Sequence, residues 1–365
     1  MQLKKWICGA LAGLSVLGAA ITASAAKASV SWDEPPKLSV VAKSSHQWTG
    51  VAVAPSGRIF VCFPTWGNHP DYHVGEILNG EVYPYRELEE HARFVCVQSL
   101  FADTKNNTLW VLDAGKRTKQ DPASSDPTLL MVDLSHNEIL RVYNLPPDVA
   151  LPDSMMADVR VDAARGVAYI TDSGHGGIIV LDLNTGNAWR ALTDIPEVQS
   201  RLQAIYFPTG LFSDLADCNG LELSADKKLL YFSSLGGDVL YSVPTAVLLN
   251  EALSVAQREK EIKAVNVQNV PTDGMVLRND ALYMGALSYE GIWEFFLNET
   301  NVAEAGAIVN LGVDLRWADS FARASDNSVY FTTSALNYAV DQQPPYELYH
   351  MVWPEKREQQ NPYGN

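Results

Sequence analysis

The stretch NGLELSAD at residues 219–226 leads through a short polar turn into LLYF at residues 229–232, and VLYSV follows at residues 239–243. Short runs rich in Leu, Tyr, Phe and Val, separated by turns that contain Asp, Asn or Gly, are typical of antiparallel β-strands. Units of the same kind begin near residues 50, 97, 157, 219, 273 and 317. Six such units at a period of roughly 50 residues predict an all-β fold, a six-bladed β-propeller in a single domain.

Two segments outside these units have expected places. LSVV at residues 38–41 precedes the first unit. We expect it to pair with the last blade and close the ring, which would leave no long strand edge open. Residues 245–263 follow the third run of the fourth unit and have a helix-like composition. We expect this segment to lie outside the ring.

The first 25 residues predict the cellular location of the protein. Lys4 and Lys5 precede an apolar run at residues 6–20, and Ala23-Ser24-Ala25 has the small-x-small pattern of a signal-peptidase site. These features indicate a cleaved signal peptide at residues 1–25 and a mature propeller at residues 26–365, and therefore a secreted or periplasmic protein. A membrane-spanning helix is disfavoured, because the run is short and no basic stop-transfer flank follows it. No later run reaches the roughly 18 apolar residues of a membrane span.

Charge and cysteine content narrow the possible partners and bonds. The 365 residues carry a formal net charge of −16, so the chain would repel a nucleic-acid backbone. Cys62, Cys96 and Cys218 remain after cleavage, so at most one intrachain disulfide can form. Cys62 and Cys96 are the expected pair because they lie in neighbouring strand-like runs. The alternative is that all three are buried free thiols.

The first strand of each blade lines the central channel of a propeller, so side chains at the start of the six units should converge there. The candidate ligand-binding residues chosen in this way are Trp48, Gln98, Asp158, Asn219, Asp273 and Asp319. Several carboxylate and amide oxygens at one mouth would suit a hard cation such as Ca²⁺. Alternatively, the Asp and Asn residues are turn formers that bond nearby backbone N–H groups, and the Trp is core between blades.

Three other kinds of site have no support in the sequence. The seven histidines include no pair spaced for zinc, and there is no HExxH motif. SGHGG at residues 173–177 lies between two strand-like runs, which predicts a hairpin loop and not a phosphate loop. The chain has no GxSxG motif, so nothing indicates a serine hydrolase.

Four stretches resemble the motifs of one family. They are LWVLDAG at residues 109–115, ADVRVD at 157–162, WADSFA at 317–322 and YFTTS at 330–334. These resemble LWVLDTG, NDIxVD, WPDTFA and YFTTS of the yellow and major royal jelly protein family, with a more distant similarity to the regucalcin and gluconolactonase propellers. The resemblance also implies a six-bladed propeller. Members of the family include secreted ligand-binding proteins, some for biogenic amines, nutritional proteins, and enzymes that act on dopachrome.

The gluconolactonase branch implies a metal-dependent lactone hydrolase instead. Asn219 and Asp273 match two of its metal ligands, and the resemblance implies that Asp273 is also the catalytic base that activates water. The other two ligands differ, because Trp48 and Thr49 stand at the place of a Glu and Ala157 stands at the place of an Asn. Such a site would bind metal weakly, recruit further carboxylates, or serve as a ligand pocket.

The leading hypothesis is an exported propeller that binds a small organic ligand in its central channel, where acidic side chains favour a cationic or metal-bridged ligand. The alternative is a divalent-metal-dependent lactonase, with Ca²⁺ as the expected cofactor and Asp273 as the catalytic residue. A third hypothesis is a protein–protein interaction scaffold, because fold does not fix function.

Overall fold

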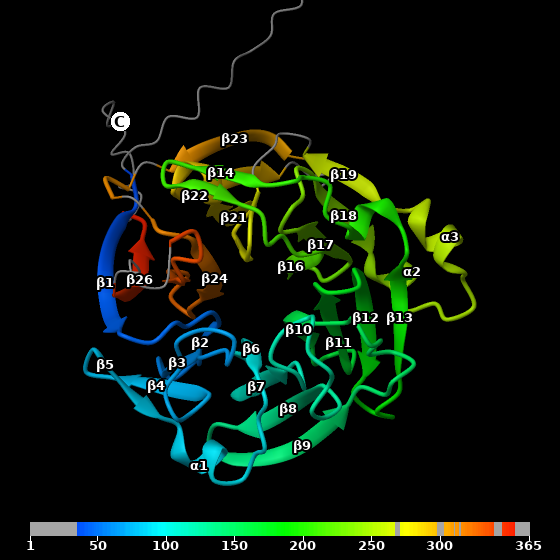
Figure 1. The fold of residues 1–365 in the computed structure, drawn as a ribbon, viewed down its shortest axis with the longest axis horizontal. Helices are drawn as coiled ribbons and strands as arrows, with labels where there is room; N and C mark the ends of the chain where they lie inside the picture. Colours follow the sequence, from blue (N-terminus) through cyan, green and yellow to red (C-terminus); the bar gives the residue numbers. More distant parts are fainter. Residues whose placement is uncertain are drawn as a thin grey trace, which may run out of the picture. The chain divides into compact units, whose positions relative to one another are not determined.

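The computed structural model describes residues 35–266, 271–297, 303–309, 311–313, 315–338 and 345–354. The predicted signal peptide, residues 1–25, lies outside these ranges. Within them the chain forms six four-stranded antiparallel sheets and one two-stranded hairpin. The six sheets are the blades of a β-propeller (Figure 1), so the predicted fold class is confirmed.

Within each of the first five blades the strands follow one another in the chain, from the innermost strand outward. Blade 1 holds β2 (Val51–Val53), β3 (Ile59–Cys62), β4 (Val74–Leu78) and β5 (Glu81–Pro84). Blade 2 holds β6 (Val97–Asp103), β7 (Thr108–Asp113), β8 (Thr128–Asp133) and β9 (Glu138–Asn144). Blade 3 holds β10 (Met156–Asp162), β11 (Val167–Asp172), β12 (Gly177–Asp182) and β13 (Ala188–Thr193). Blade 4 holds β16 (Cys218–Leu223), β17 (Leu229–Ser234), β18 (Leu240–Pro244) and β19 (Lys263–Asn266). Blade 5 holds β20 (Met275–Arg278), β21 (Ala281–Ala286), β22 (Gly291–Leu297) and β23 (Ala303–Val309).

The last blade joins the two ends of the described chain. It contains β24 (Ala318–Arg323), β25 (Val329–Thr333) and β26 (Tyr346–Val352), and its outermost strand is β1 (Lys37–Ser44). β1 pairs antiparallel with β26, from Lys37 opposite Val352 to Ser44 opposite Tyr346. The predicted pairing of residues 38–41 with the last blade is therefore confirmed. It closes the ring through hydrogen bonds between distant parts of the sequence.

Short helices lie in the connections between strands. They are α1 (Arg86–Glu89), η1 (Pro196–Val198), α2 (Thr245–Leu248), α3 (Val255–Glu259) and η2 (Leu287–Tyr289). α2 and α3 connect β18 to β19 and lie at the periphery of the ring (Figure 1), as predicted for residues 245–263. None of the helices within the described ranges is long and apolar enough to cross a membrane.

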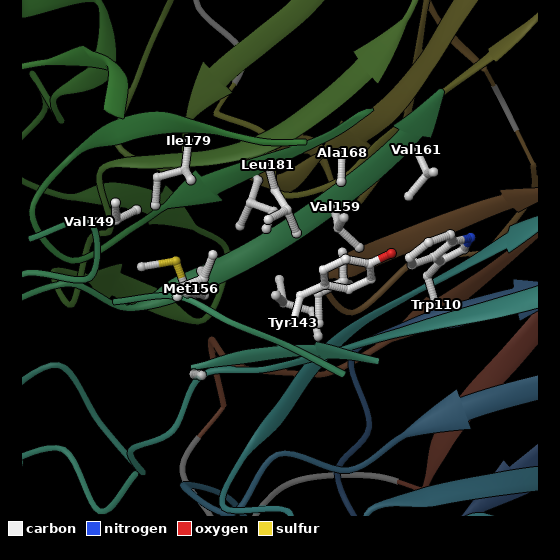
Figure 2. Close-up of a cluster of buried hydrophobic side chains, with 14 of the residues drawn as sticks. Trp110, Tyr143, Val149, Met156, Val159, Val161, Ala168, Ile179 and Leu181 are labelled. Atoms are coloured by element: carbon white, nitrogen blue, oxygen red, sulfur yellow. The ribbon is translucent and has the colours of Figure 1, made fainter. Parts of the chain in front are cut away.

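The blades pack face to face through apolar side chains. Figure 2 shows one such cluster, between blades 2 and 3, where Trp110 lies beside Tyr143 with a ring separation of 6.3 Å. Val159 and Val161 of the inner strand β10 enter the same cluster together with Ile179. β-branched and aromatic residues fill the space between two pleated surfaces well, which explains why the strands are so rich in them. Trp110 is therefore a core residue.

Glycines allow neighbouring inner strands to approach closely. A Cβ on Gly220 would lie 2.2 Å from the carbonyl oxygen of Asp273, and one on Gly274 would lie 2.3 Å from the carbonyl oxygen of Asp319. The N–H of Gly274 donates to that same Asp319 carbonyl at 2.7 Å. Any side chain at either glycine would push two blades apart. The glycines that follow Asn219 and Asp273 therefore keep the channel narrow.

The expected disulfide is wrong. Cys62, Cys96 and Cys218 are all free and buried. Cys62 Sγ accepts from the backbone N–H of Gly50 at 3.2 Å, and Cys96 Sγ accepts from the Gln98 amide at 2.9 Å. Cys96 Sγ also accepts from the backbone N–H of Thr65 at 3.3 Å. The alternative of three buried thiols is the one observed.

The closure by β1 yields a stability prediction. A chain that begins at residue 45 lacks β1, whereas a chain that begins at residue 35 retains it and serves as the matched control. Removing β1 exposes the edge of β26 and the apolar side chains beneath it. We expect the shorter chain to melt roughly 10 °C lower, corresponding to a few kcal/mol, and to aggregate more readily. Equal melting temperatures, measured by circular dichroism, would show that the closing strand is dispensable.

Candidate functional site

The central channel has two ends, which we name by the direction of the inner strands. At the N-terminal mouth, where the inner strands begin, a cavity of about 30 Å³ lies on the channel axis. Its lining residues are Gln98, Ser99, Ala157, Asp158, Asn219, Gly220, Asp273, Gly274, Asp319 and Ser320. Five of the six predicted ligand-binding residues are thus brought together, although they come from five different blades. The cavity has room for about one water molecule.

Trp48 is the sixth predicted residue, and it lies elsewhere. Its side chain is fully buried, and its indole N–H donates to the Thr333 carbonyl at 3.2 Å. The ring packs 6.2 Å from that of Phe63. Trp48 therefore belongs to the core where blades 6 and 1 meet, and it does not line the cavity.

β-bulges direct the site residues toward the channel. The register of four inner strands shifts at the N-terminal mouth, between Val97 and Ser99, Met156 and Val159, Cys218 and Gly220, and Ala318 and Phe321. The residues within these shifts include Gln98, Asp158, Asn219 and Asp319. A bulge turns a side chain away from the regular alternation of a strand. Side chains that would otherwise pack between blades are thereby available to the channel.

Asp273 accepts two hydrogen bonds from side chains of the neighbouring blades. The Asn219 amide donates to Oδ1, and the Trp317 indole N–H donates to Oδ2 at 2.7 Å. Trp317 has a positive φ of 64°, a backbone conformation that a bulky residue rarely adopts. Burial raises the pKa of Asp273 to about 6, although the Trp317 hydrogen bond opposes the shift. This carboxyl group is therefore poised to change charge near neutral pH.

Asp319 is the second acid of the pair. Its side chain is only 6% exposed, and its Oδ2 has no hydrogen-bond partner among the described residues. Burial, and then the charge of Asp273, raise the pKa of Asp319 well above its ordinary value. Two carboxyl groups in contact cannot both ionise easily in a buried place. The pair therefore holds its proton more tightly than an isolated carboxyl group would.

Asp158, unlike Asp273 and Asp319, has a cationic partner in the channel. The buried guanidinium of Arg160 donates to Asp158 at 2.9 Å and to Glu222 at 3.2 Å. It also donates to the Met275 carbonyl of blade 5 at 2.9 Å. Burial would lower the pKa of Arg160, but the charges of the two carboxylates raise it above its ordinary value. Ser99 of blade 2 donates to Asp158 at 2.6 Å, so this network connects four blades across the channel.

A hairpin packs against Trp317, beside the N-terminal mouth. It consists of β14 (Ile205–Phe207) and β15 (Gly210–Phe212), which form the two-stranded sheet between blades 3 and 4 in the chain. The hairpin reaches blade 5, where β14 contacts η2 (Figure 1). Phe207 stacks on the Trp317 ring at 5.5 Å, and Phe212 meets it edge-on at 4.7 Å. The hairpin therefore packs directly on a residue that bonds Asp273.

Three parts of the site were not predicted from the sequence. The hairpin has a recognisable signal, since the turn residues Pro208-Thr209-Gly210 separate two apolar runs. Arg160 lies two residues after Asp158 on one strand, and this spacing alone predicts a common face. The bond between Trp317 and Asp273 joins different blades, and no local pattern indicates it.

The donor set does not fit the metal site that the gluconolactonase resemblance implies. Both oxygens of Asp273 already accept N–H groups, including an indole that cannot turn into a ligand. Asp158 is neutralised by Arg160. Among the described residues, no three His, Cys, Asp or Glu side chains are grouped so that they could hold a metal ion. The geometry supports proton transfer by carboxyl groups and offers no built Ca²⁺ cage.

Comparisons with known proteins agree with this picture of the fold. The profile of the major royal jelly protein family matches residues 96–305, which confirms the resemblance found in the sequence. Dopaminechrome tautomerase of Drosophila melanogaster is 23% identical over 223 residues, which cover 54% of this chain and 48% of the relative. The chain thus spans about half the length of this curated relative.

Solved propellers share the fold at low sequence identity. A gluconolactonase from Xanthomonas campestris is 14% identical with a TM-score of 0.54, over 88% of this chain and 95% of the other. The calcium-binding protein regucalcin from Agrobacterium tumefaciens is 14% identical with a TM-score of 0.55 over the same shares. An aldose sugar dehydrogenase from Streptomyces coelicolor has a TM-score of 0.54 at 12% identity, over 87% of this chain and 99% of the other. At this identity the likeness is one of architecture.

The Arg160 network predicts a large loss of stability on truncation. Arg160→Met leaves two buried carboxylates without a cation, which typically costs about 3–5 kcal/mol. The matched control is Arg165→Met on the same blade. The guanidinium of Arg165 is partly exposed and forms a longer ion pair, of 3.6 Å. We expect this substitution to lower the free energy of unfolding by less than about 1 kcal/mol. Urea unfolding measures both. Adding Asp158→Asn and Glu222→Gln to Arg160→Met should restore part of the loss, and no recovery would contradict the electrostatic explanation.

The raised pKa of Asp273 predicts a pH-dependent stability. Because the folded-state pKa of about 6 lies above the ordinary value of 3.8, the folded state binds the proton more tightly, and stability is lost as pH rises between these values. Asp273→Asn removes that loss, while the Asn219 amide can rotate to donate or accept. We expect the variant to be more stable than the wild type at pH 7.5, on the order of 2 kcal/mol, but not at pH 4. A variant that is less stable at both pH values would identify Asp273 as a structural anchor.

Proposed function

The chain belongs to the major royal jelly protein family, and on this premise we propose that it binds a small organic molecule at the N-terminal mouth and moves a proton on it, as a tautomerase does. The observation that carries the proposal is the pair Asp273 and Asp319, two carboxyl groups in one cavity with raised pKa values and no cation in contact with them in the described structure. The proposal includes export, as the first 25 residues predict.

Tautomerisation needs a base and an acid and no other reagent. One C–H bond of the substrate breaks and its proton goes to the base, while a proton from the acid forms an O–H bond on the same substrate, so nothing is oxidised or reduced. Asp273 would be the base, because a pKa of about 6 leaves it largely ionised at neutral pH. Asp319 would be the acid, because burial and the charge of Asp273 raise its pKa well above its ordinary value. Carboxyl groups whose environments separate their pKa values commonly take these two roles.

The relative with a known reaction supports the same chemistry. Its name gives dopaminechrome as the molecule that it tautomerises. At 23% identity the substrate of this chain is part of the proposal, and dopaminechrome is the first probe. The acidic mouth would favour a cationic or electron-poor ring.

Substrate access would require the N-terminal mouth to widen. The cavity of about 30 Å³ is too small for an organic ring, whereas ligand pockets usually measure about 300–1,000 Å³. β14 and β15 pack on Trp317 mainly through two phenylalanines, and the exposed Tyr206 and Leu211 on the same hairpin add little to this contact. We propose that the hairpin lifts to admit substrate and closes to exclude water from the acid pair.

The alternative function, a metal-dependent lactonase, can be distinguished from the proposed tautomerase by experiment. It would need Ca²⁺ or another divalent ion on Asn219 and Asp273, where both oxygens of the Asp accept N–H groups. No observation in the described structure favours that activity or an interaction scaffold over proton transfer. Treatment with a chelator separates the two chemistries, since proton transfer by carboxyl groups needs no metal.

The test is the rate at which purified protein discharges the visible absorbance of dopaminechrome. Asp273→Asn should lower kcat by about 10²–10⁴-fold, because it removes the general base. In the wild type, kcat/KM should rise with pH through about 6, as Asp273 loses its proton. Asp226→Asn, an exposed turn carboxylate in blade 4, is the matched control and should leave the rate unchanged. Chelator should not change any of these rates.

Two results would overturn the proposal. One is full activity in Asp273→Asn. The other is a wild-type rate that falls on chelation and returns with Ca²⁺, which would move the chemistry to a metal.

A further inference from the structure

The other end of the channel holds a much larger cavity. At the C-terminal mouth, where the inner strands end, a funnel of about 550 Å³ opens, within the usual range for small-molecule sites. Every inner strand contributes to its wall. The contributing segments include Val51–Val53, Leu100–Asp103, Arg160, Val161, Glu222, Leu223, Val276, Leu277 and Phe321–Arg323.

The funnel is separate from the cavity of the proposed active site. The two cavities share no lining residue. Arg160 lines the funnel, and its bond to Asp158 marks the point where the N-terminal cavity ends. The guanidinium crosses from blade 3 to Glu222 of blade 4 and to a carbonyl of blade 5. A molecule in the funnel would therefore meet a closed floor, with Arg160 already saturated by its partners.

Cationic side chains outnumber anionic ones among the residues that line the funnel. Lys105 and Arg323 are exposed, and neither side chain forms an ion pair in the described structure. The lining residues include four cations, Lys105, Arg160, Lys227 and Arg323, and two carboxylates, Asp103 and Glu222. Glu222 accepts from Arg160 and from the backbone N–H of Leu223, and Asp103 accepts from the turn that follows it. Two free cations at one mouth stand out in a chain with a formal net charge of −16.

The wall behind these cations offers apolar surface. Phe101 is partly exposed on the inner strand of blade 2, and its ring lies 5.8 Å from the Arg160 guanidinium. Ala102 and Ala322, also partly exposed, continue this surface toward the rim. Small side chains at these positions keep the funnel wide. Apolar walls with a few charged groups at the opening are the usual composition of a small-molecule site.

We propose that the funnel is a second binding site, for a small organic anion with an apolar body such as an aryl sulfonate or a medium-chain carboxylate. The body of the ligand would lie against Phe101 and the alanines, and its anionic group would lie between Lys105 and Arg323. This site is independent of the proposed tautomerase activity and would persist if that activity were absent.

The test uses the fluorescent anion 8-anilinonaphthalene-1-sulfonate as the probe, titrated against the folded protein. The double variant Lys105→Glu and Arg323→Glu should weaken binding at least 10-fold, and sodium octanoate should displace the probe from the wild type. The double variant Lys260→Glu and Lys263→Glu is the matched control, since it makes the same change in net charge at two exposed cations, at the end of α3 and on the outermost strand β19 of blade 4. It should bind like the wild type. Thermal melts confirm that all three proteins are folded.

Three outcomes would overturn the proposal. They are the absence of probe binding to the wild type at micromolar concentrations, an affinity in the funnel double variant equal to that of the wild type, and an equal loss of affinity in the control double variant. The last outcome would show a general effect of net charge instead of a site at the funnel.

Discussion

Arg160 crosses the central channel and forms ion pairs with Asp158 and Glu222, the two carboxylates that face it. A buried guanidinium is tolerable only where its donors are satisfied and its charge is compensated. Here the acceptors come from three blades, and a fourth is tied in through Ser99. The position of the blades around the axis is thus set by a polar contact at the centre as well as by the apolar layers between them. The same contact divides the channel into two cavities with different chemistry.

Asp273 and Asp319 can keep their raised pKa values because the Arg160 network does not include them. Asp273 and Asp319 lie on the side of the channel that Arg160 does not reach, so burial raises their pKa values without a cation to reverse the shift. Such a pair destabilises the folded state, and the surrounding structure must compensate. The closed ring supplies that rigidity, because β1 joins the last blade to the start of the chain. The positive φ of Trp317 is a further local strain at the same place.

Much of the fold could be predicted because its information is local. Apolar runs alternate with polar turns, such as the turn at residues 225–228, and this repetition itself indicates a propeller. The channel residues were found for a geometric reason, since inner strands converge whatever their sequence. What failed depends on distant contacts. Trp48 is core because its indole meets a carbonyl of the last blade, and the thiol of Cys96 turns to Gln98 instead of Cys62. Neither partner can be read from neighbouring residues.

The β-bulges connect the local strand pattern with the contacts between distant residues at the site. A regular inner strand would direct its side chains alternately toward the two adjacent blades, and a purely apolar pattern would suffice to build the ring. The register shifts of β6, β10, β16 and β24 give up ladder hydrogen bonds at the N-terminal mouth only. Beyond them the strands pair regularly down to the wide funnel. Because a bulge interrupts pairing without adding packing, four of them at one level are hard to explain by stability alone. They are explained if the mouth must present polar side chains to a bound molecule, which is why the acid pair, more than the larger cavity, supports a chemical role for this channel.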